Sequence, residues 1–248
     1  MGCFKPSLRA QSTIGRGNLS ISARERFRLP QRLRRLAMTH GVSFTLLFIW
    51  AFTAPLTIAA AEPLKIVALG DSLTEGYHLP KSQSYPAQLQ AMLREAGVAV
   101  VIENHGISGD TTAGGRARLP KVLAAEPDMV IVALGANDFL RGIPPAAARA
   151  NLQAIVKELT DQHIPTLLIG IQVPSNLGPA YKQQFDAIFT DLAARYPVTL
   201  HYDFLKNVAG KASLNLSDGM HPNEAGYKIV AQNLLPVVQQ MLQKIAAR

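Results

Sequence analysis

The sequence contains a single cysteine, Cys3, among 248 residues. Everything beyond Cys3 therefore lacks the thiols required for a disulfide, a thiolate nucleophile or a cysteine-ligated zinc site. Aromatic residues are also few, at 6%, which leaves little material for stacking platforms. Any chemistry in the chain has to come from hydroxyl, imidazole, carboxylate or amide groups.

Beyond residue 61 the sequence also lacks a surplus of positive charge. The whole chain has a net charge of +8, but residues 1–61 hold nine Lys/Arg and one acid, Glu25. Residues 62–248 therefore carry 16 basic and 16 acidic side chains. A surface for nucleic acid needs clustered cationic charge on the folded part of a protein. We expect no nucleic-acid partner.

Residues 1–61 have the composition of a leader. The first 31 residues are basic and without apolar periodicity, which is typical of disorder. Arginines then precede an uncharged apolar stretch, Val42–Ile58, which is followed by three alanines ending at Ala61. This order predicts a signal peptide cleaved after Ala61, with an uncleaved membrane anchor as the alternative. We expect a periplasmic or secreted protein that meets the membrane only through this segment.

Residues 62–248 are predicted to form one domain with an α/β fold. Short runs of Val, Ile and Leu alternate with helical patterns, which indicates a three-layer αβα arrangement around a five-stranded parallel sheet. The expected strands are Leu64–Leu69, Val98–Glu103, Met129–Leu134, Pro165–Ile171 and Val198–Tyr202. The expected helices are Tyr85–Ala96, Thr112–Ala125, Pro145–Gln162, Ala180–Tyr196 and Glu224–Ala247.

Polar segments follow the first three expected strands. These are Gly70-Asp71-Ser72, Asn104–Asp110 and Gly135–Gly142, and a fourth, Ser217–Pro222, precedes the last helix. In a parallel α/β sheet, ligands bind beyond the carboxyl ends of the strands. The four segments are therefore expected to converge on one edge of the sheet.

The convergent residues have the chemistry of acyl transfer. A serine hydroxyl becomes nucleophilic when a base removes its proton and a third group orients that base. Ser72 lies where a strand ends, His221 is the natural base, and Asp218 can reach the other ring nitrogen from the same loop. The three residues are predicted to be catalytic, without a metal or another cofactor.

An oxyanion hole can be built from three donors beside this triad. The Ser72 and Gly109 backbone N–H groups and the Asn137 side-chain amide follow three different strands, so they can meet where negative charge develops. Each motif alone also fits a turn or a helix cap. The interpretation depends on all of them occurring together at strand ends.

These motifs resemble those of the SGNH hydrolases, also called the GDSL esterase/lipase family. The four named positions are Ser72 in Gly-Asp-Ser-Leu, Gly109, Asn137 in Gly-x-Asn-Asp, and His221 in Asp-x-x-His. The likeness extends from Leu64 almost to the C-terminus and is closest to bacterial arylesterases and multifunctional acyl-CoA thioesterase/lysophospholipases. It implies a flavodoxin-like five-stranded fold, an acyl-serine intermediate and a periplasmic location.

The resemblance also implies where the substrate binds. In this branch the loops after strands three and four line the acyl pocket, which makes apolar residues of Phe139–Ile143 and Gln172–Pro179 the substrate-binding candidates. These are Leu140, Ile143, Val173, Pro174 and Leu177. Such a lining suits a small acyl ester or thioester.

Three alternatives stay open at this point. One is a carbohydrate deacetylase that uses the same site, and another is a non-catalytic lipid- or envelope-binding module. The third is a nucleotide-binding protein, although GDSLTEG lacks the glycine spacing of phosphate-binding loops. Nothing in the sequence points to a particular oligomeric state.

Overall fold

The computed structural model describes residues 62–202 and 204–247. The predicted leader and its cleavage point after Ala61 lie outside these described residues. Within them, no helix is both long enough and apolar enough to cross a membrane.

The centre of the fold is a sheet of five parallel strands. They are β1 (Leu64–Gly70), β2 (Val100–Gly106), β3 (Met129–Ala133), β4 (Thr166–Ile169) and β5 (Thr199–His201). Their order in the sheet is β2-β1-β3-β4-β5. The chain moves from β1 to one side and then returns to build the other side, so the crevice at the carboxyl end of β1 is the topological switch point. The predicted five-stranded parallel α/β fold is confirmed.

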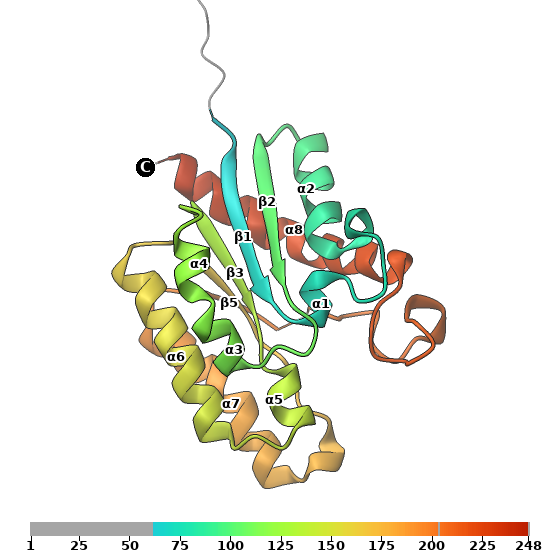
Figure 1. Cartoon of the computed structure of the whole chain (residues 1–248). Helices are drawn as coiled ribbons and strands as arrows, with labels where there is room; N and C mark the ends of the chain where they lie inside the picture. The colour runs from blue at the N-terminus through green and yellow to red at the C-terminus, as the bar shows by residue number, and fades with distance from the viewer. Residues whose placement is uncertain (1–61, 203, 248) are drawn as a thin grey trace, which may run out of the picture. The chain divides into compact units, whose positions relative to one another are not determined.

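Helices cover both faces of the sheet (Figure 1). One face carries α2 (Tyr85–Glu95) and α8 (Glu224–Ala246); the other carries α3 (Thr112–Ala117), α4 (Leu119–Leu123), α6 (Pro145–Asp161) and α7 (Pro179–Arg195). Two short helices, α1 (Ser72–Glu75) and α5 (Ala136–Leu140), follow β1 and β3 directly. Single 3-10 turns occur at η3 (Lys81–Gln83), η4 (Ser175–Leu177) and η5 (Ala212–Leu214).

The core has two halves because successive strand side chains point to opposite faces. Ile66 of β1 belongs to the apolar cluster that includes Leu89 of α2 and Val230 of α8. Its neighbour Val67 belongs to the cluster that includes Leu152 of α6. Both strand residues are fully buried, which explains why β1 has an uninterrupted apolar sequence.

The expected helix over Thr112–Ala125 is divided in two, and the prediction of one continuous helix was wrong. α3 ends at Ala117 and α4 starts at Leu119, with Pro120 in its first turn. Proline has no N–H to donate and its ring clashes with the carbonyl four residues earlier, so the first helix cannot continue through it.

The second strand is also displaced from its expected position of Val98–Glu103. It runs to Gly106 because it pairs with β1 along its whole length, with Leu64 opposite Val100 and Gly70 opposite Gly106. Its polar last residues resemble a loop in the sequence. The register with β1 places them in the sheet and brings the segment that follows to the edge beside Ser72.

Candidate active site

Ser72 is presented by an abrupt change from strand to helix. β1 ends at Gly70, and the Asp71 carboxylate caps α1 by accepting a hydrogen bond of 3.0 Å from the Leu73 N–H. A side chain at Gly70 would collide with Thr74, so glycine allows this helical turn to fold back tightly onto the strand. Ser72 is therefore the first residue of the helix, and its N–H has no acceptor within the helix.

Ser72, His221 and Asp218 form a continuous hydrogen-bonded chain. The Ser72 Oγ lies 2.9 Å from His221 Nε2, and His221 Nδ1 lies 2.7 Å from Asp218 Oδ2. Because Asp218 accepts at Nδ1, this nitrogen carries the proton and Nε2 is left to accept the hydroxyl proton of Ser72. The geometry meets the requirement for a serine that is activated by an oriented base.

The Asp218 carboxylate is held ionised by its own loop. Its Oδ1 accepts the backbone N–H groups of Met220 (2.9 Å) and His221 (3.0 Å). The backbone and ring of His221 together lower the pKa of Asp218 to about 2. The loop itself is closed by a hydrogen bond of 2.7 Å from the Leu216 N–H to the His221 carbonyl. One short rigid segment therefore supplies both the base and the acid that orients it.

Tyr77 packs on the imidazole of His221. The two ring centroids are 4.3 Å apart, at an interplanar angle of 33°. The phenol ring thus restricts rotation of the histidine, which the hydrogen bond to Asp218 already directs. Tyr77 was not singled out in the sequence, where its position just after a glycine reads as an ordinary turn.

The three expected oxyanion donors follow strand ends that are in register. Gly70 of β1 pairs with Gly106 of β2 and with Ala133 of β3, and Ser72, Gly109 and Asn137 come two, three and four residues after these positions. The Gly109 N–H has no acceptor among the described residues, and the Asn137 Nδ2 donates only weakly to Asp71 Oδ2, at 3.4 Å. The N–H of Gly109 and the amide of Asn137 are thus available to a ligand.

Side chains from two short helices hold the loop that carries Gly109. The Glu75 Oε2 accepts the Ser108 N–H at 2.8 Å and also the Ser108 hydroxyl. The Arg141 guanidinium donates to the Gly109 carbonyl at 2.6 Å. Gly109 has a φ of 81°, a conformation that favours glycine. The orientation of the Gly109 N–H is therefore fixed by Glu75, which holds the preceding residue Ser108, and by Arg141, which holds the Gly109 carbonyl.

Two further acids, Asp71 and Asp110, brace the strand ends. Asp71 is almost fully buried, and burial raises its pKa to about 7. Asp110 forms an ion pair of 2.5 Å with Arg118. The same guanidinium donates to the carbonyl oxygens of His105 (2.9 Å) and Gly70 (3.2 Å), which ties β1 to β2.

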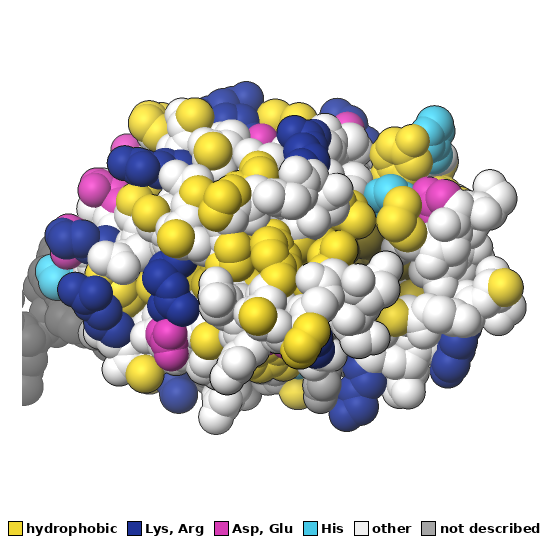
Figure 2. All heavy atoms as spheres, turned by 90° about the horizontal axis from the view of Figure 1, so that it is seen from below, with side chains coloured by type: hydrophobic (Ala, Val, Ile, Leu, Met, Phe, Trp, Pro, Cys, Tyr) yellow, Lys and Arg dark blue, Asp and Glu magenta, His cyan; other side chains and the backbone are white. Residues whose placement is uncertain are grey.

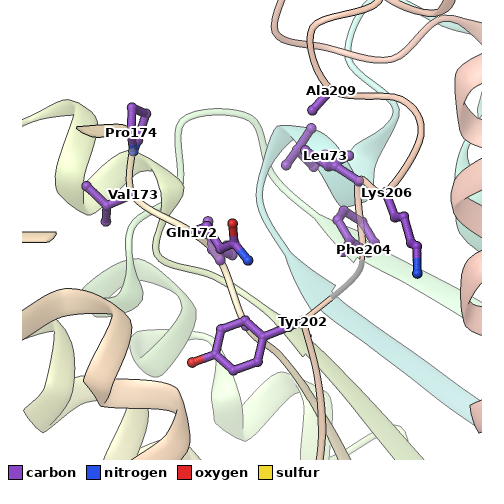
Figure 3. A pocket seen from close by; sticks show the side chains of 11 residues that line it. Leu73, Gln172, Val173, Pro174, Tyr202, Phe204, Lys206 and Ala209 are labelled. Carbon is purple, nitrogen blue, oxygen red and sulfur yellow. The ribbon is translucent and has the colours of Figure 1, made fainter. Parts of the chain in front are cut away.

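An apolar cavity of about 400 Å³ is lined in part by Leu73, the residue that follows Ser72. Val173 and Pro174 line one wall, and Leu73, Phe204 and Ala209 lie across from them (Figure 3). Hydrophobic side chains gather across the middle of the face formed by the carboxyl ends of the strands (Figure 2). Its mostly apolar lining suits an acyl chain.

The cavity differs in part from the one expected from the sequence. Leu140, Ile143 and Leu177 do not line it. Leu140 and Leu177 are instead 59% and 40% exposed, and the Ile143 carbonyl accepts a hydrogen bond from the Tyr181 hydroxyl at 2.7 Å. Residues that follow β5 (202, 204–206 and 209) form the second wall, and they carry no motif that could have identified them.

Known proteins resemble the chain in both sequence and structure. It is 38% identical over 185 residues to "Esterase TesA" of Pseudomonas aeruginosa, covering 74% of this chain and 91% of that protein. It is 34% identical over 206 residues to "Thioesterase 1/protease 1/lysophospholipase L1" of Escherichia coli K12, covering 81% and 98%.

The fold matches that of a solved esterase. A crystal structure of the psychrotrophic esterase EstA from a Pseudoalteromonas species, inhibited by monoethylphosphonate, superposes with a TM-score of 0.69 at 32% identity. The match covers 72% of this chain and 98% of that chain. The model of the GDSL-like lipase/acylhydrolase family matches residues 68–229, a range that includes the end of β1 and the expected catalytic and oxyanion residues. This chain belongs to the GDSL-like lipase/acylhydrolase family, that is, to the SGNH hydrolases.

Proposed function

We propose that this protein is a serine hydrolase that cleaves carboxylic esters and thioesters through an acyl-Ser72 intermediate. The observation that carries the proposal is the chain of hydrogen bonds from Ser72 Oγ to His221 Nε2 (2.9 Å) and from His221 Nδ1 to Asp218 (2.7 Å). The names of the relatives, an esterase and a thioesterase/lysophospholipase, agree with this reaction class.

In the first half of the reaction, Ser72 Oγ attacks the carbonyl carbon of the substrate while His221 Nε2 takes its proton. The bond from that carbon to the alcohol oxygen or thiol sulfur then breaks, and His221 gives the proton to the leaving atom. In the second half, His221 removes a proton from water, which attacks the acyl carbon. Ser72 leaves with the proton and the carboxylic acid is released.

The oxyanion that forms in each half is proposed to bind three donors. The N–H groups of Ser72 and Gly109 and the side-chain amide of Asn137 supply them. Such donors are effective because they are already oriented when the charge appears. The hydrogen bonds from Glu75 to Ser108 and from Arg141 to Gly109 support this role, since they orient the loop before substrate arrives.

The acyl group of the substrate is proposed to occupy the cavity lined by Leu73, Val173 and Phe204. Its walls are mostly apolar, which favours an acyl or aryl group over a sugar, whose hydroxyls need polar partners. This is the reason to prefer an esterase or thioesterase over a carbohydrate deacetylase. We further propose, from the leader sequence alone, that the protein is exported to the periplasm or beyond.

The reaction is tested by burst kinetics with p-nitrophenyl butyrate. The wild type is expected to release about one equivalent of p-nitrophenol rapidly and then to turn over more slowly, because the acyl-enzyme accumulates. Ser72→Ala is expected to show no burst and to lose at least about a thousandfold in kcat. Equal hydrolysis by both proteins would make Ser72 a turn residue, and a non-catalytic binding module would become the better interpretation.

A further inference from the structure

The proposed oxyanion hole depends on the direction in which the Asn137 amide points. An asparagine side chain presents an NH₂ group with two donors on one side and a carbonyl oxygen, which only accepts, on the other. If the amide turned by 180°, its oxygen would take the place of its nitrogen and would repel the negative charge that forms on the substrate. The proposed reaction therefore requires a group that keeps the nitrogen in place.

The main chain at Asn137 is already held, whereas the amide depends on one contact. The Asn137 carbonyl accepts the Arg141 N–H at 3.2 Å, and the neighbouring Asp138 carboxylate accepts the N–H and the hydroxyl of Thr112 at 2.8 and 2.6 Å. Among the described residues, the only hydrogen-bond partner of the Asn137 amide is Asp71, whose Oδ2 lies 3.4 Å from Nδ2. The contact with Asp71 thus distinguishes the two orientations of the amide.

Asp71 is itself fixed between the nucleophile and this donor. It is almost fully buried, and its Oδ1 accepts the Leu73 N–H at 3.0 Å. One carboxyl oxygen therefore holds the turn that presents Ser72, while the other faces the Asn137 amide. Since Asp71 engages one N–H of that amide, the second N–H is left for the oxyanion.

We propose that Asp71 is a positioning residue whose carboxylate sets the orientation of the Asn137 amide for the oxyanion. This inference rests on the proposed function. An ionised carboxylate only accepts hydrogen bonds, so it binds the nitrogen of the amide and repels the oxygen. A protonated carboxyl has an O–H to donate and can bind the amide oxygen as well. The ionised form of Asp71 is therefore the form that supports turnover.

The groups around Asp71 bring its ionisation close to neutral pH. The titratable groups that act on it are Asp110 from the segment after β2, Tyr85 from α2 and Tyr227 from α8. None of the three is a cation, and burial raises the pKa of Asp71 to about 7. The amide of Asn137 opposes this rise by stabilising the carboxylate. By reciprocity, the carboxylate stabilises the amide in its donating orientation.

The test is a double-mutant cycle between Asp71 and Asn137, with p-nitrophenyl butyrate as the substrate. Asp71→Asn keeps an oxygen for the Leu73 N–H, so α1 retains its cap, but turns an NH₂ group toward the Asn137 amide. At pH 8 it is expected to lower kcat about tenfold and to change KM less than about twofold, because transition-state stabilisation alone is weakened. Asn137→Ala is expected to lose about a hundredfold in kcat. In that background, Asp71→Asn should change kcat less than about twofold.

The control replaces a carboxylate by an amide away from the site. Asp191→Asn does so at an exposed ion pair with Arg149, and it should leave kcat unchanged in either background. The pH dependence gives a further readout, since the ratio of wild-type to Asp71→Asn kcat is expected to rise between pH 6 and pH 8. The ionisation of His221 cancels in this ratio, because both proteins contain His221 and only the wild type has a carboxyl at position 71.

Three results would overturn the assignment. One is a wild-type kcat in Asp71→Asn. Another is an equal loss with and without the Asn137 amide, which would mean that Asp71 acts on the Ser72 turn alone. The third is a ratio that does not change with pH. Failure of the proposed function would be seen separately, because the wild type and Ser72→Ala would then show the same burst kinetics.

Discussion

Asp71 and Asp218 show how the same side chain acquires opposite properties at one site. Asp71 is 1% exposed, and burial raises its pKa to about 7. Asp218 accepts two backbone N–H groups and the ring of His221, and its pKa falls to about 2. The sequence could place Asp218 and His221 together because only two residues separate them. It could not distinguish the charge states, because these depend on which groups the fold places around each carboxylate.

The raised pKa of Asp71 predicts how stability depends on pH. Below about pH 4 Asp71 is protonated in both states, and between about pH 4 and 7 only the folded state keeps the proton. Its contribution to stability is therefore lost as the pH rises through this window. Asp71→Asn, which stays neutral and remains a good helix N-cap, is expected to be more stable than wild type at pH 8 by up to about 4 kcal/mol.

Urea denaturation at pH 5 and pH 8 measures this effect, and the difference between the two pH values should shrink in Asp71→Asn. Asp191→Asn is the matched control, because Asp191 is a surface carboxylate that is 57% exposed and pairs with Arg149 at 2.8 Å. This variant should keep the wild-type difference between pH 5 and pH 8. An Asp71→Asn variant with the full wild-type difference would contradict the assignment.

At the scale of elements, the site depends on two short helices that the sequence did not reveal. α1 and α5 have four and five residues, too short for a periodic pattern. In α5, the helical turn places Asn137 and the capping residue Arg141 four residues apart, so that both lie on the same side of the helix. Asp138, between them, accepts hydrogen bonds from the Thr112 N–H (2.8 Å) and hydroxyl (2.6 Å). The segment after β2 is therefore fastened to two residues that follow Asn137, namely Asp138 and Arg141.

The hydrogen bond from Arg141 to the Gly109 carbonyl predicts that removing the Arg141 side chain lowers kcat. Arg141→Ala is expected to lower kcat for p-nitrophenyl butyrate about tenfold while KM changes less than about twofold, because an oxyanion donor that is less well oriented weakens transition-state stabilisation. Arg141→Lys should recover part of the loss, since it retains a donor.

Arg149→Ala is the control for removal of an arginine, because Arg149 pairs with Asp191 between α6 and α7 at 2.8 Å. Its steady-state constants should match wild type. If Arg141→Ala instead raised KM at constant kcat, Arg141 would be a substrate-binding residue and not a positioning residue.

At the scale of the whole molecule, the cavity that we propose for the acyl group is formed by segments that are distant in sequence. Val173 follows β4, Phe204 and Ala209 follow β5, and Leu73 follows β1. Val173 and Pro174, which the family resemblance indicated through the loop after strand four, line this cavity. The sequence could not indicate the wall after β5, because the path of that segment across the site depends on packing rather than on any local pattern.

This arrangement predicts control of acyl chain length by Ala209. Ala209→Phe adds bulk to the cavity wall and is expected to lower kcat/KM for p-nitrophenyl octanoate at least about tenfold relative to p-nitrophenyl butyrate. Leu140→Ala and Leu177→Ala change the exposed residues that the sequence had indicated, and should leave the ratio of the two esters near the wild-type value. A shift in that ratio with Leu140→Ala but not with Ala209→Phe would contradict this assignment and would place the acyl group beside Leu140.

The sequence by itself determined the alternation of strands and helices, the parallel sheet and the identity of the Ser, Gly, Asn, Asp and His residues at its edge. These follow from local information, since apolar runs specify buried strands and short motifs specify strand ends. Only the tertiary structure decided the extension of β2 to Gly106, the elevated pKa of Asp71 and the walls of the cavity beside Leu73. Register, burial and cavity shape arise from contacts between residues far apart in the chain, and no local pattern encodes them.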